Sequence, residues 1–236
     1  MTKKQIMVIT GTSKGIGKDA ARFFADGERM VFGCGRSENS LPDIKNYKYT
    51  QVDVTSEVQV RQWFNSIKKH TDHIDALVCF AGIMPAGMLY AVSPKQTLDD
   101  VFSVTVGGTF IVCKEALKMM IPQRFGSIIT ISSMTAGIHM EGTSIYSASK
   151  SAVAEMSMVL AKEVAPLGIT CNVIAPSVYN TDAAKALGEA TIERLLDKQT
   201  IKRELKIEEI CNVISFFMAP ESKCITGQII HMGLVN

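Results

Sequence analysis

Paired cysteines and paired histidines are both missing from this sequence. The six cysteines are scattered and form no C-x-x-C pair: Cys34, Cys79, Cys113, Cys171, Cys211 and Cys224. The four histidines are dispersed, and none is spaced with another as a metal-binding pair: His70, His73, His139 and His231. A disulfide framework and a metal site are therefore not expected, and the thiols are interpreted as reduced core residues.

Long apolar runs and a large excess of one charge are also absent. No run reaches the ~18 apolar residues of a membrane-spanning helix, and the apolar run after Lys3 and Lys4 is too short for the core of a signal peptide. The net charge of +2 rests on scattered lysines and arginines, which form no basic stripe for nucleic acid. We therefore expect a cytoplasmic protein that binds neither nucleic acid nor a membrane.

What the sequence does contain is a regular alternation of short apolar runs and helical patterns. Strands are expected at residues 5–10, 30–35, 47–52, 74–80, 127–132, 168–175 and 225–231. Helices are expected up to residue 26 after the first strand, at 56–70 with Thr55 as the cap, and at 97–123, 144–165 and 207–219. This alternation predicts one α/β domain over residues 1–236, a Rossmann-like doubly wound parallel sheet with helices on both faces. The polar stretch 177–206 is interpreted as a substrate lid.

A glycine-rich turn connects the first expected strand to the first helix. It reads Thr10-Gly-Thr-Ser-Lys-Gly-Ile-Gly17, a G-x-x-x-G-x-G spacing. Such a turn lets backbone amides approach a phosphate, and the helix N-terminus favours an anion. The alternative is a tight turn that binds no ligand.

Two basic residues lie where a dinucleotide fold contacts the adenosine ribose. Arg36 directly follows the second strand, and Lys14 lies in the glycine-rich turn. An acidic residue at the tip of this strand holds a 2′-hydroxyl, whereas a basic residue accommodates a 2′-phosphate. The two cations together favour NADP(H) over NAD(H), and the alternative for each is a solvated surface charge.

A tyrosine and a lysine at helical spacing form the third pattern. Tyr146 and Lys150 are four residues apart and share one face of a helix. A nearby ammonium favours the phenolate, so the pairing predicts a lowered Tyr146 pKa and a role as general acid or base. Ser133 lies at the end of an expected strand, at the edge of the sheet where α/β proteins bind ligands. The alternative is an exposed helix face without a role.

Taken in order, these residues resemble the short-chain dehydrogenase/reductase family over nearly the whole chain, and within it the 3-oxoacyl-acyl-carrier-protein reductase group. The resemblance rests on the glycine-rich turn, Asp53-Val54, Ala81-Gly82, Ser133, Tyr146-x-x-x-Lys150, Pro176 and Ile225-Thr-Gly227. It implies a parallel sheet of seven strands, NADP(H) as cofactor, and a small-molecule or carrier-bound carbonyl substrate. It also implies a homotetramer or homodimer, built through the helices at 97–123 and 144–165.

The resemblance implies a role for each matching residue. Tyr146 would protonate the carbonyl oxygen, Ser133 would hydrogen-bond that oxygen, and Lys150 would lower the Tyr146 pKa and bind the nicotinamide ribose. The cofactor residues would be Gly11, Ser13, Lys14, Gly15, Ile16 and Gly17 at the diphosphate and adenosine, Arg36 at the 2′-phosphate, Asp53 and Val54 at adenine, Ala81 and Gly82 at the ribose, and Pro176, Val178 and Thr181 at the nicotinamide.

The chain also departs from the family pattern. Phe80 and Thr105 stand where the family has asparagines, and Ser177 follows Pro176 where the family has glycine. The C-terminal Asp-Gly-Gly of the family is replaced by Met232-Gly233-Leu234. The expected function is reduction of a ketone or 3-oxoacyl-type carbonyl by NADPH. The alternatives are reduction of a sugar or polyketide intermediate, and an NADP-binding protein whose catalysis has decayed.

Overall fold

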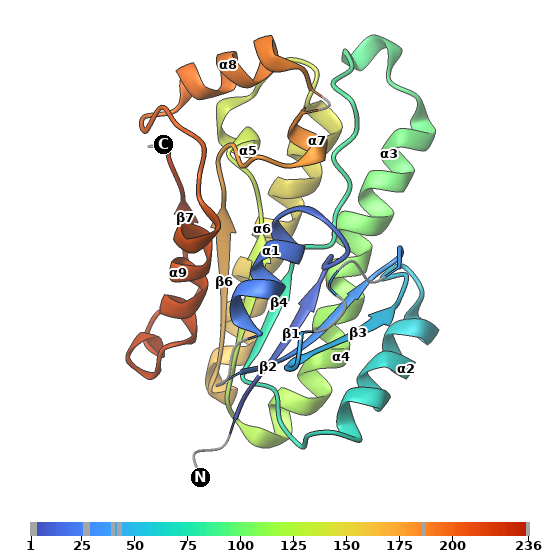
Figure 1. The fold of residues 1–236 in the computed structure, drawn as a ribbon, viewed down its shortest axis with the longest axis vertical. Coiled ribbons are helices and arrows are strands. Elements are labelled where there is room, and N and C mark those ends of the chain that lie inside the picture. Colours follow the sequence, from blue (N-terminus) through green and yellow to red (C-terminus); the bar gives the residue numbers. More distant parts are fainter. Residues whose placement is uncertain (1–3, 26–28, 39–40, 42–43, 186, 235–236) are drawn as a thin grey trace.

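The computed structural model describes residues 4–25, 29–38, 41, 44–185 and 187–234 (Figure 1). Its centre is a parallel sheet of seven strands in the order β3-β2-β1-β4-β5-β6-β7. The strands are β1 Gln5–Thr10, β2 Arg29–Gly35, β3 Tyr47–Gln51, β4 Ala76–Cys79, β5 Gly126–Ile131, β6 Ile169–Ala175 and β7 Ile229–His231. Every residue of β4 and β6 is buried, as expected for parallel strands covered on both faces. The predicted doubly wound α/β architecture is confirmed.

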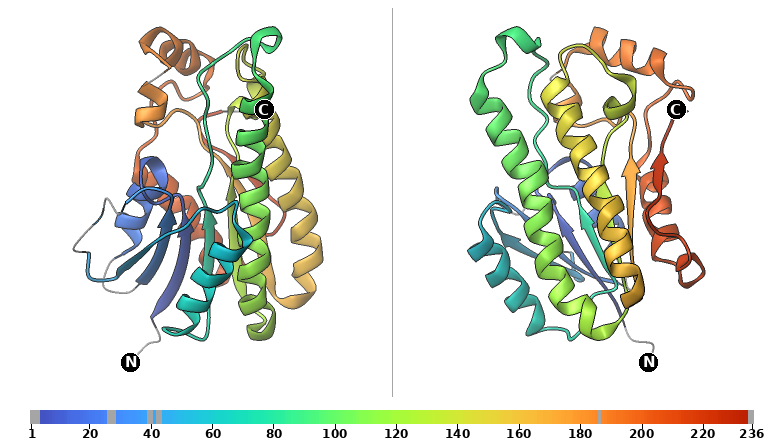
Figure 2. Two further views of the ribbon diagram at one scale, coloured as in Figure 1. Left: turned by 90° about the vertical axis from the view of Figure 1, so that its right-hand side faces the viewer. Right: turned by 180° about the vertical axis from the view of Figure 1, so that it is seen from behind.

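Helices cover both faces of the sheet (Figure 2). On one face lie α1 Gly15–Phe24 and α9 Ile207–Met218; on the other lie α2 Glu57–Lys68, α4 Gly108–Gln123 and α6 Ser144–Val164. Successive side chains of β1 enter the two cores in turn. Val8 packs with the α2, α4 and α6 layer, and Ile9 packs with the α1 and α9 layer.

The long helix expected at 97–123 is divided by a widened turn. The structure has α3 Lys95–Phe102, a π-helical turn η2 Ser103–Gly107, and then α4. The two interior glycines differ in packing. A Cβ atom on Gly108 would lie 2.5 Å from Cγ2 of Val54, whereas one on Gly107 would meet nothing closer than 3.8 Å. Close packing therefore explains why glycine is needed at position 108, but it does not explain the glycine at position 107.

Two boundaries differ from expectation for local reasons. The last strand begins at Ile229 rather than at 225, because Gly227 has a left-handed φ of 66° that breaks the extended conformation. Ser56, not Thr55, caps α2: its side chain accepts a hydrogen bond from the Gln59 amide, while the Thr55 hydroxyl donates to Asp53. One short helix, α5 Thr135–Ile138, was not predicted.

The stretch 177–206 crosses the carboxyl ends of the strands and contains α7 Asp182–Lys185 and α8 Glu189–Lys198 (Figure 1). Leu195 of α8 is buried in a small apolar cluster with Met134 and Val178. The remaining turns are η1 Tyr90–Val92, η3 Ala165–Leu167 and η4 Pro220–Ser222. None of the described helices combines the length and apolar character that crossing a bilayer requires.

Candidate active site

A cleft of about 1150 Å³ opens along the carboxyl edge of the sheet, between the strand ends and the 177–206 stretch. The expected catalytic residues Ser133, Tyr146 and Lys150 all line it. The expected cofactor residues that line it are Gly11, Ser13, Lys14, Gly15, Ile16, Gly17, Arg36, Val54, Ala81, Gly82, Pro176, Val178 and Thr181. One cavity therefore brings together segments that are far apart in the sequence.

Asp53 is the exception among the expected residues, since its neighbours Val52 and Val54 line the cleft and it does not. Its carboxylate accepts hydrogen bonds from the amide of Thr55 at 2.9 Å and from the hydroxyl of the same residue at 2.8 Å. The side chain thus organises the turn before α2. Its expected contact with adenine stays a prediction.

The glycine-rich turn is shaped by close approaches that exclude a side chain. Gly11 has a φ of 74°, and a Cβ atom there would lie 2.7 Å from the amide nitrogen of Ala81. A Cβ atom on Gly17 would lie 2.4 Å from the carbonyl oxygen of Gly11. The turn leads into the N-terminus of α1, whose first turn contains no acidic residue. This end of the cleft is suited to a diphosphate, because helix N-termini attract anions.

The end of the cleft formed by β2 and the glycine-rich turn is positively charged. Lys14 and Arg36 are both exposed and both line it, and no described carboxylate from these two segments does. Gln51 donates a hydrogen bond from its side chain to the Arg36 carbonyl at 2.7 Å, which fixes the backbone where β2 ends.

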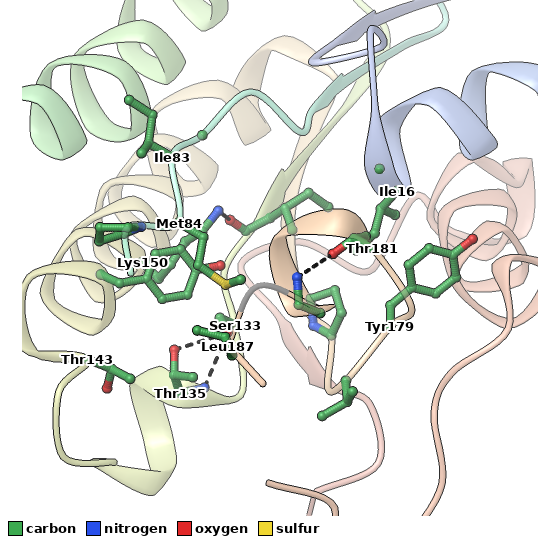
Figure 3. Close-up of a pocket in the computed structure, with 18 of the residues that line it drawn as sticks. Ile16, Ile83, Met84, Ser133, Thr135, Thr143, Lys150, Tyr179, Thr181 and Leu187 are labelled. Carbon is green, nitrogen blue, oxygen red and sulfur yellow. Dashed lines mark hydrogen bonds between the residues drawn. The ribbon is translucent and has the colours of Figure 1, made fainter. Parts of the chain in front are cut away.

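Ser133 is oriented by the turn that follows β5. Its Oγ accepts hydrogen bonds from the Thr135 amide at 3.3 Å and from the Thr135 hydroxyl at 3.1 Å (Figure 3). With both acceptor positions used, the Ser133 hydroxyl hydrogen is left to donate, and the Ser133 hydroxyl is close enough to Tyr146 to lower the pKa of that phenol. Thr135 was missed in the sequence, although Ser-x-Thr at a strand end is a pattern for such side-chain turns.

Lys150 lies deep in the cleft and is only 5% exposed. Its Nζ donates to the carbonyl oxygen of Ile131 at 2.8 Å and lies 5.8 Å from the centre of the Tyr146 ring. Burial lowers the pKa of the Lys150 amine to about 8, and the nearby Cys79 thiol opposes this shift. Lys150 is therefore held between strand β5 and Tyr146.

The pKa of Tyr146 differs from the expectation. The spacing to Lys150 predicts a lowered pKa, but in the structure burial raises the pKa of the phenol, and the nearby Ser133 hydroxyl opposes the rise only in part. The helical spacing correctly predicts that the two residues are neighbours. It contains no information about the loss of water around both groups, which acts on the phenol and the amine in opposite senses.

Thr105 lies at the centre of the π-helical turn and is fully buried. Its Oγ1 accepts a hydrogen bond from the Ile83 amide at 3.3 Å. The Thr105 carbonyl accepts from the Thr109 hydroxyl at 2.7 Å. Thr105 thus ties the segment after β4, including Gly82, to the helix.

The other end of the cleft is largely apolar. Its methionines are Met84, Met88, Met134 and Met140, whose unbranched side chains can adapt to ligands of different shape. His139 also lines the cleft, with a left-handed φ of 53° and its Nδ1 2.6 Å from the Gly137 carbonyl oxygen. No group of three metal-binding side chains occurs within the described part of the chain.

Residues 11–233 match a protein-family model described as enoyl-(acyl carrier protein) reductase. The chain is 31% identical over 238 residues to the 3-oxoacyl-[acyl-carrier-protein] reductase FabG of Buchnera aphidicola subsp. Baizongia pistaciae (strain Bp), which covers 98% of this chain and 97% of that protein. It is 30% identical over 234 residues to FabG of Escherichia coli (strain K12), with 97% and 96% covered.

Solved structures with the same fold include ElxO with NADP bound, at a TM-score of 0.89 and 26% identity over 97% of both chains. They also include a variant of actinorhodin polyketide ketoreductase with NADPH, at a TM-score of 0.88 and 24% identity, covering 97% of this chain and 95% of that one. At that identity the second similarity establishes the fold alone.

Proposed function

The chain belongs to the short-chain dehydrogenase/reductase family, and on this premise we propose that it is an enzyme that reduces a ketone or 3-oxoacyl-type carbonyl to an alcohol with NADPH. The observation that carries the proposal is the meeting of Ser133, Tyr146 and Lys150 in the same cleft as the glycine-rich turn. Two unrelated requirements, a place for a dinucleotide and a proton donor, are met in one cavity.

The residues present fit NADP(H). The close approach of Gly11 to Ala81 opens the turn for a diphosphate at the N-terminus of α1. Lys14 and Arg36 supply positive charge for a 2′-phosphate, and ElxO, a structural relative, has been solved with NADP bound. Ala81, Gly82, Pro176, Val178 and Thr181 would border the ribose and nicotinamide. When bound, the nicotinamide supplies a hydride to the carbonyl carbon.

Three side chains of this protein would deliver the proton that the carbonyl oxygen needs. Tyr146 keeps its proton at neutral pH because burial raises its pKa, so it can donate that proton to the carbonyl oxygen as the alcohol forms. Ser133, oriented by Thr135, donates a hydrogen bond to the same oxygen. Lys150 stabilises the phenolate that remains and would bind the nicotinamide ribose.

The substrate class follows from the relatives and from the cleft. The two FabG relatives are named as reductases of 3-oxoacyl groups on an acyl carrier protein, and the methionine-lined end of the cleft suits an apolar group beside the carbonyl. A sugar or polyketide intermediate is the alternative substrate. Decayed catalysis is less well supported, because Ser133, Tyr146 and Lys150 all line one cleft despite the unusual Phe80 and Thr105.

The proposal extends to the whole protein: a single cytoplasmic domain over residues 1–236, with 177–206 as a substrate lid, assembled as a homotetramer or homodimer. Support for assembly comes from apolar side chains exposed on two helices, Phe110 and Ile121 on α4 and Val159 on α6. These are the helices through which relatives are expected to associate.

The test is NADPH oxidation over a panel of acyl thioesters, ketones, quinones and keto-sugars, followed by Tyr146→Phe on a confirmed substrate. Loss of the positioned acid should lower turnover by about 10²–10⁴-fold, with NADPH affinity nearly unchanged. Tyr90→Phe is the matched control, since that phenol is 85% exposed. A Tyr146→Phe variant that turns over within about threefold of the parent contradicts the assignment. NADPH binding without turnover on any substrate would favour decayed catalysis.

A further inference from the structure

A hydrogen bond joins the base of the lid to the helix that follows the glycine-rich turn. The hydroxyl of Tyr179 donates to Oδ2 of Asp19 at 2.8 Å. Tyr179 is two residues beyond Ser177, where the lid begins, and Asp19 lies on α1. The two residues are far apart in the sequence, and neither was among the residues expected to bind or react.

Residues at the two ends of the lid are bonded to each other, so Tyr179 is connected to both ends of the 177–206 stretch. The Leu205 amide donates to the Val178 carbonyl at 2.8 Å, and Tyr179 and Leu205 form a parallel β-bridge. Farther along, the amides of Thr200 and Ile201 both donate to the carbonyl of Gly233. Holding Tyr179 in place therefore holds both ends of the lid in place.

Two residues after Tyr179, the lid contacts the glycine-rich turn. Cγ2 of Thr181 lies 3.4 Å from the position that a Cβ atom on Gly15 would occupy. The Thr181 hydroxyl accepts from the Ala184 amide at 3.0 Å, and its carbonyl accepts from the Lys185 amide at 2.9 Å, which together start α7 (Figure 3). Thr181, the residue before the first helix of the lid, thus contacts the turn where the diphosphate is proposed to bind.

The Tyr179 ring is packed as well as hydrogen-bonded. It lies against the core layer that contains α1 and α9. Burial and the Asp19 carboxylate both raise the pKa of the phenol, so the bond keeps its proton throughout the neutral range. Hydrogen bonds to a charged acceptor are about twice as strong as those between neutral groups. The Tyr179–Asp19 bond therefore joins the lid firmly to α1.

We propose that Tyr179 and Asp19 are a pair of positioning residues that hold the lid against the glycine-rich turn and thereby slow cofactor release. The effect on cofactor release rests on the proposed function. We assign the pair no contact with the reacting atoms, because the Tyr179 hydroxyl donates its hydrogen to Asp19. Its loss should weaken NADPH binding and leave the proton chemistry of Tyr146 intact.

A double-mutant cycle with two readouts tests the pair. The variants are Tyr179→Phe, Asp19→Ala and their combination, with Asp19→Asn as the conservative variant that keeps an oxygen acceptor. We expect the NADPH dissociation constant to rise about 5–20-fold in each single variant, because only part of what a hydrogen bond to a charged group contributes is passed on to cofactor binding. The double variant should be no more than about twofold weaker than the weaker single one, and Asp19→Asn should stay within about threefold of the parent.

The second readout needs no cofactor. Hydrogen exchange of the Ala184 and Lys185 amides in the ligand-free protein should speed up in Tyr179→Phe and Asp19→Ala, by about fivefold or more. The Val173 amide, which donates to Gln228 inside the sheet, should keep its rate. Unchanged exchange at Ala184 and Lys185, or fully additive effects in the double variant, would overturn the proposed coupling.

The two proposals can fail separately. If the parent protein does not bind NADPH, the proposed function fails and the cofactor half of the coupling fails with it. The exchange rates at Ala184 and Lys185 still decide whether Tyr179 and Asp19 hold the lid. A kcat that stays within about twofold while KM for NADPH rises would separate positioning from a general loss of folded protein.

Discussion

We expect two single residues, Lys14 and Arg36, to decide which dinucleotide the cleft prefers. Lys14 and Arg36 line its positively charged end, and a 2′-phosphate brings roughly two negative charges. Charge-assisted bonds to it are worth about 1.5–3 kcal/mol each, so the two cations together predict a preference for NADPH of about 100-fold or more.

Arg36→Asp should reverse that preference by adding repulsion, and it is tested by the dissociation constants of NADH and NADPH. Arg61→Asp, on the exposed side of α2, changes the net charge equally without touching the cleft and should leave the preference unchanged. Equal affinity of the parent protein for NADH and NADPH would contradict the role of Lys14 and Arg36 in selecting the cofactor.

Lys150 predicts a pH dependence of stability. The unfolded chain binds this proton below a pKa of 10.5, and the folded chain only below about 8. Between these values the unfolded state holds more protons, so stability rises with pH. Each pKa unit corresponds to about 1.4 kcal/mol. The free energy of unfolding of the parent protein should therefore gain about 3 kcal/mol, relative to Lys150→Met, as the pH rises through this window.

Chemical denaturation at pH 7.5, 9 and 10.5 measures this difference. Lys162→Met is the control, because Lys162 is exposed and should give no pH-dependent difference. A gap between the parent and Lys150→Met that stays constant over the three pH values would show that burial does not lower the Lys150 pKa.

The sequence predicts the identities of the site residues better than their environments. Ser133, Tyr146 and Lys150 line the cleft as expected, because strand ends and helical spacing place them there. The orientation of the Asp53 carboxylate and the raised pKa of Tyr146 depend on neighbours such as Thr55 and on the exclusion of water. Those are properties of the packed molecule, and no local pattern encodes them.

At the scale of elements, the two glycines of the π-turn region provide a matched pair. Gly107→Ala should be neutral or stabilising by up to about 1 kcal/mol, since the backbone is helical and there is room for a methyl group. Gly108→Ala should destabilise by about 1–3 kcal/mol, because its Cβ atom would overlap Val54. Thermal unfolding of both variants compares them directly. Equal effects would show that α4 can move away from Val54 without cost.

The π-helical turn also predicts a kinetic effect. The resemblance to the family implies that asparagine at the position of Thr105 fixes a water linking the lysine to solvent, and a threonine should fix that water less well. Thr105→Asn should raise turnover by up to about 10-fold, which is ~1.4 kcal/mol of barrier. The solvent isotope effect should fall at the same time.

Thr105→Val is the companion variant, because it keeps the shape but cannot accept the hydrogen bond from the Ile83 amide. It should lower turnover. A drop in turnover for Thr105→Asn would mean that the buried site has adapted to threonine and has no room for the larger amide.

Element boundaries could be predicted only where the chain itself enforces them. The end of β6 before Pro176 is correct to the residue. The division of 97–123 by a π-turn, the short helix α5, and the late start of β7 were not predicted. The π-turn is accompanied by a tertiary contact, the Ile83 amide on Thr105, and the late start of β7 follows from the left-handed φ of Gly227. A periodic pattern reveals neither.

At the scale of the whole molecule, the exposed apolar residues of α4 and α6 predict assembly. Phe110 is 56% exposed and Val159 is 49% exposed. Phe110→Asp should lower the oligomeric mass measured by light scattering after size-exclusion chromatography, because a buried charge without a partner is costly. Phe23→Asp on α1, where Phe23 is 41% exposed, is the control and should leave the mass unchanged. A parent protein that is already monomeric at micromolar concentration would contradict the prediction.

The order of the strands has a consequence for how the chain reaches this structure. Gln5 of β1 pairs with Arg29 of β2, but the other edge of β1 is filled by β4, through Met7 with Ala76. During synthesis at ~5–20 residues per second, β1 and β2 are complete roughly 2–9 seconds before β4 has been made. Pairings between distant segments form slowly, and an open strand edge is a template for other chains. The interior strand β1 is therefore among the first to be synthesised but receives its second neighbour late, and its unpaired edge is where a nascent chain is most open to pairing with a second copy.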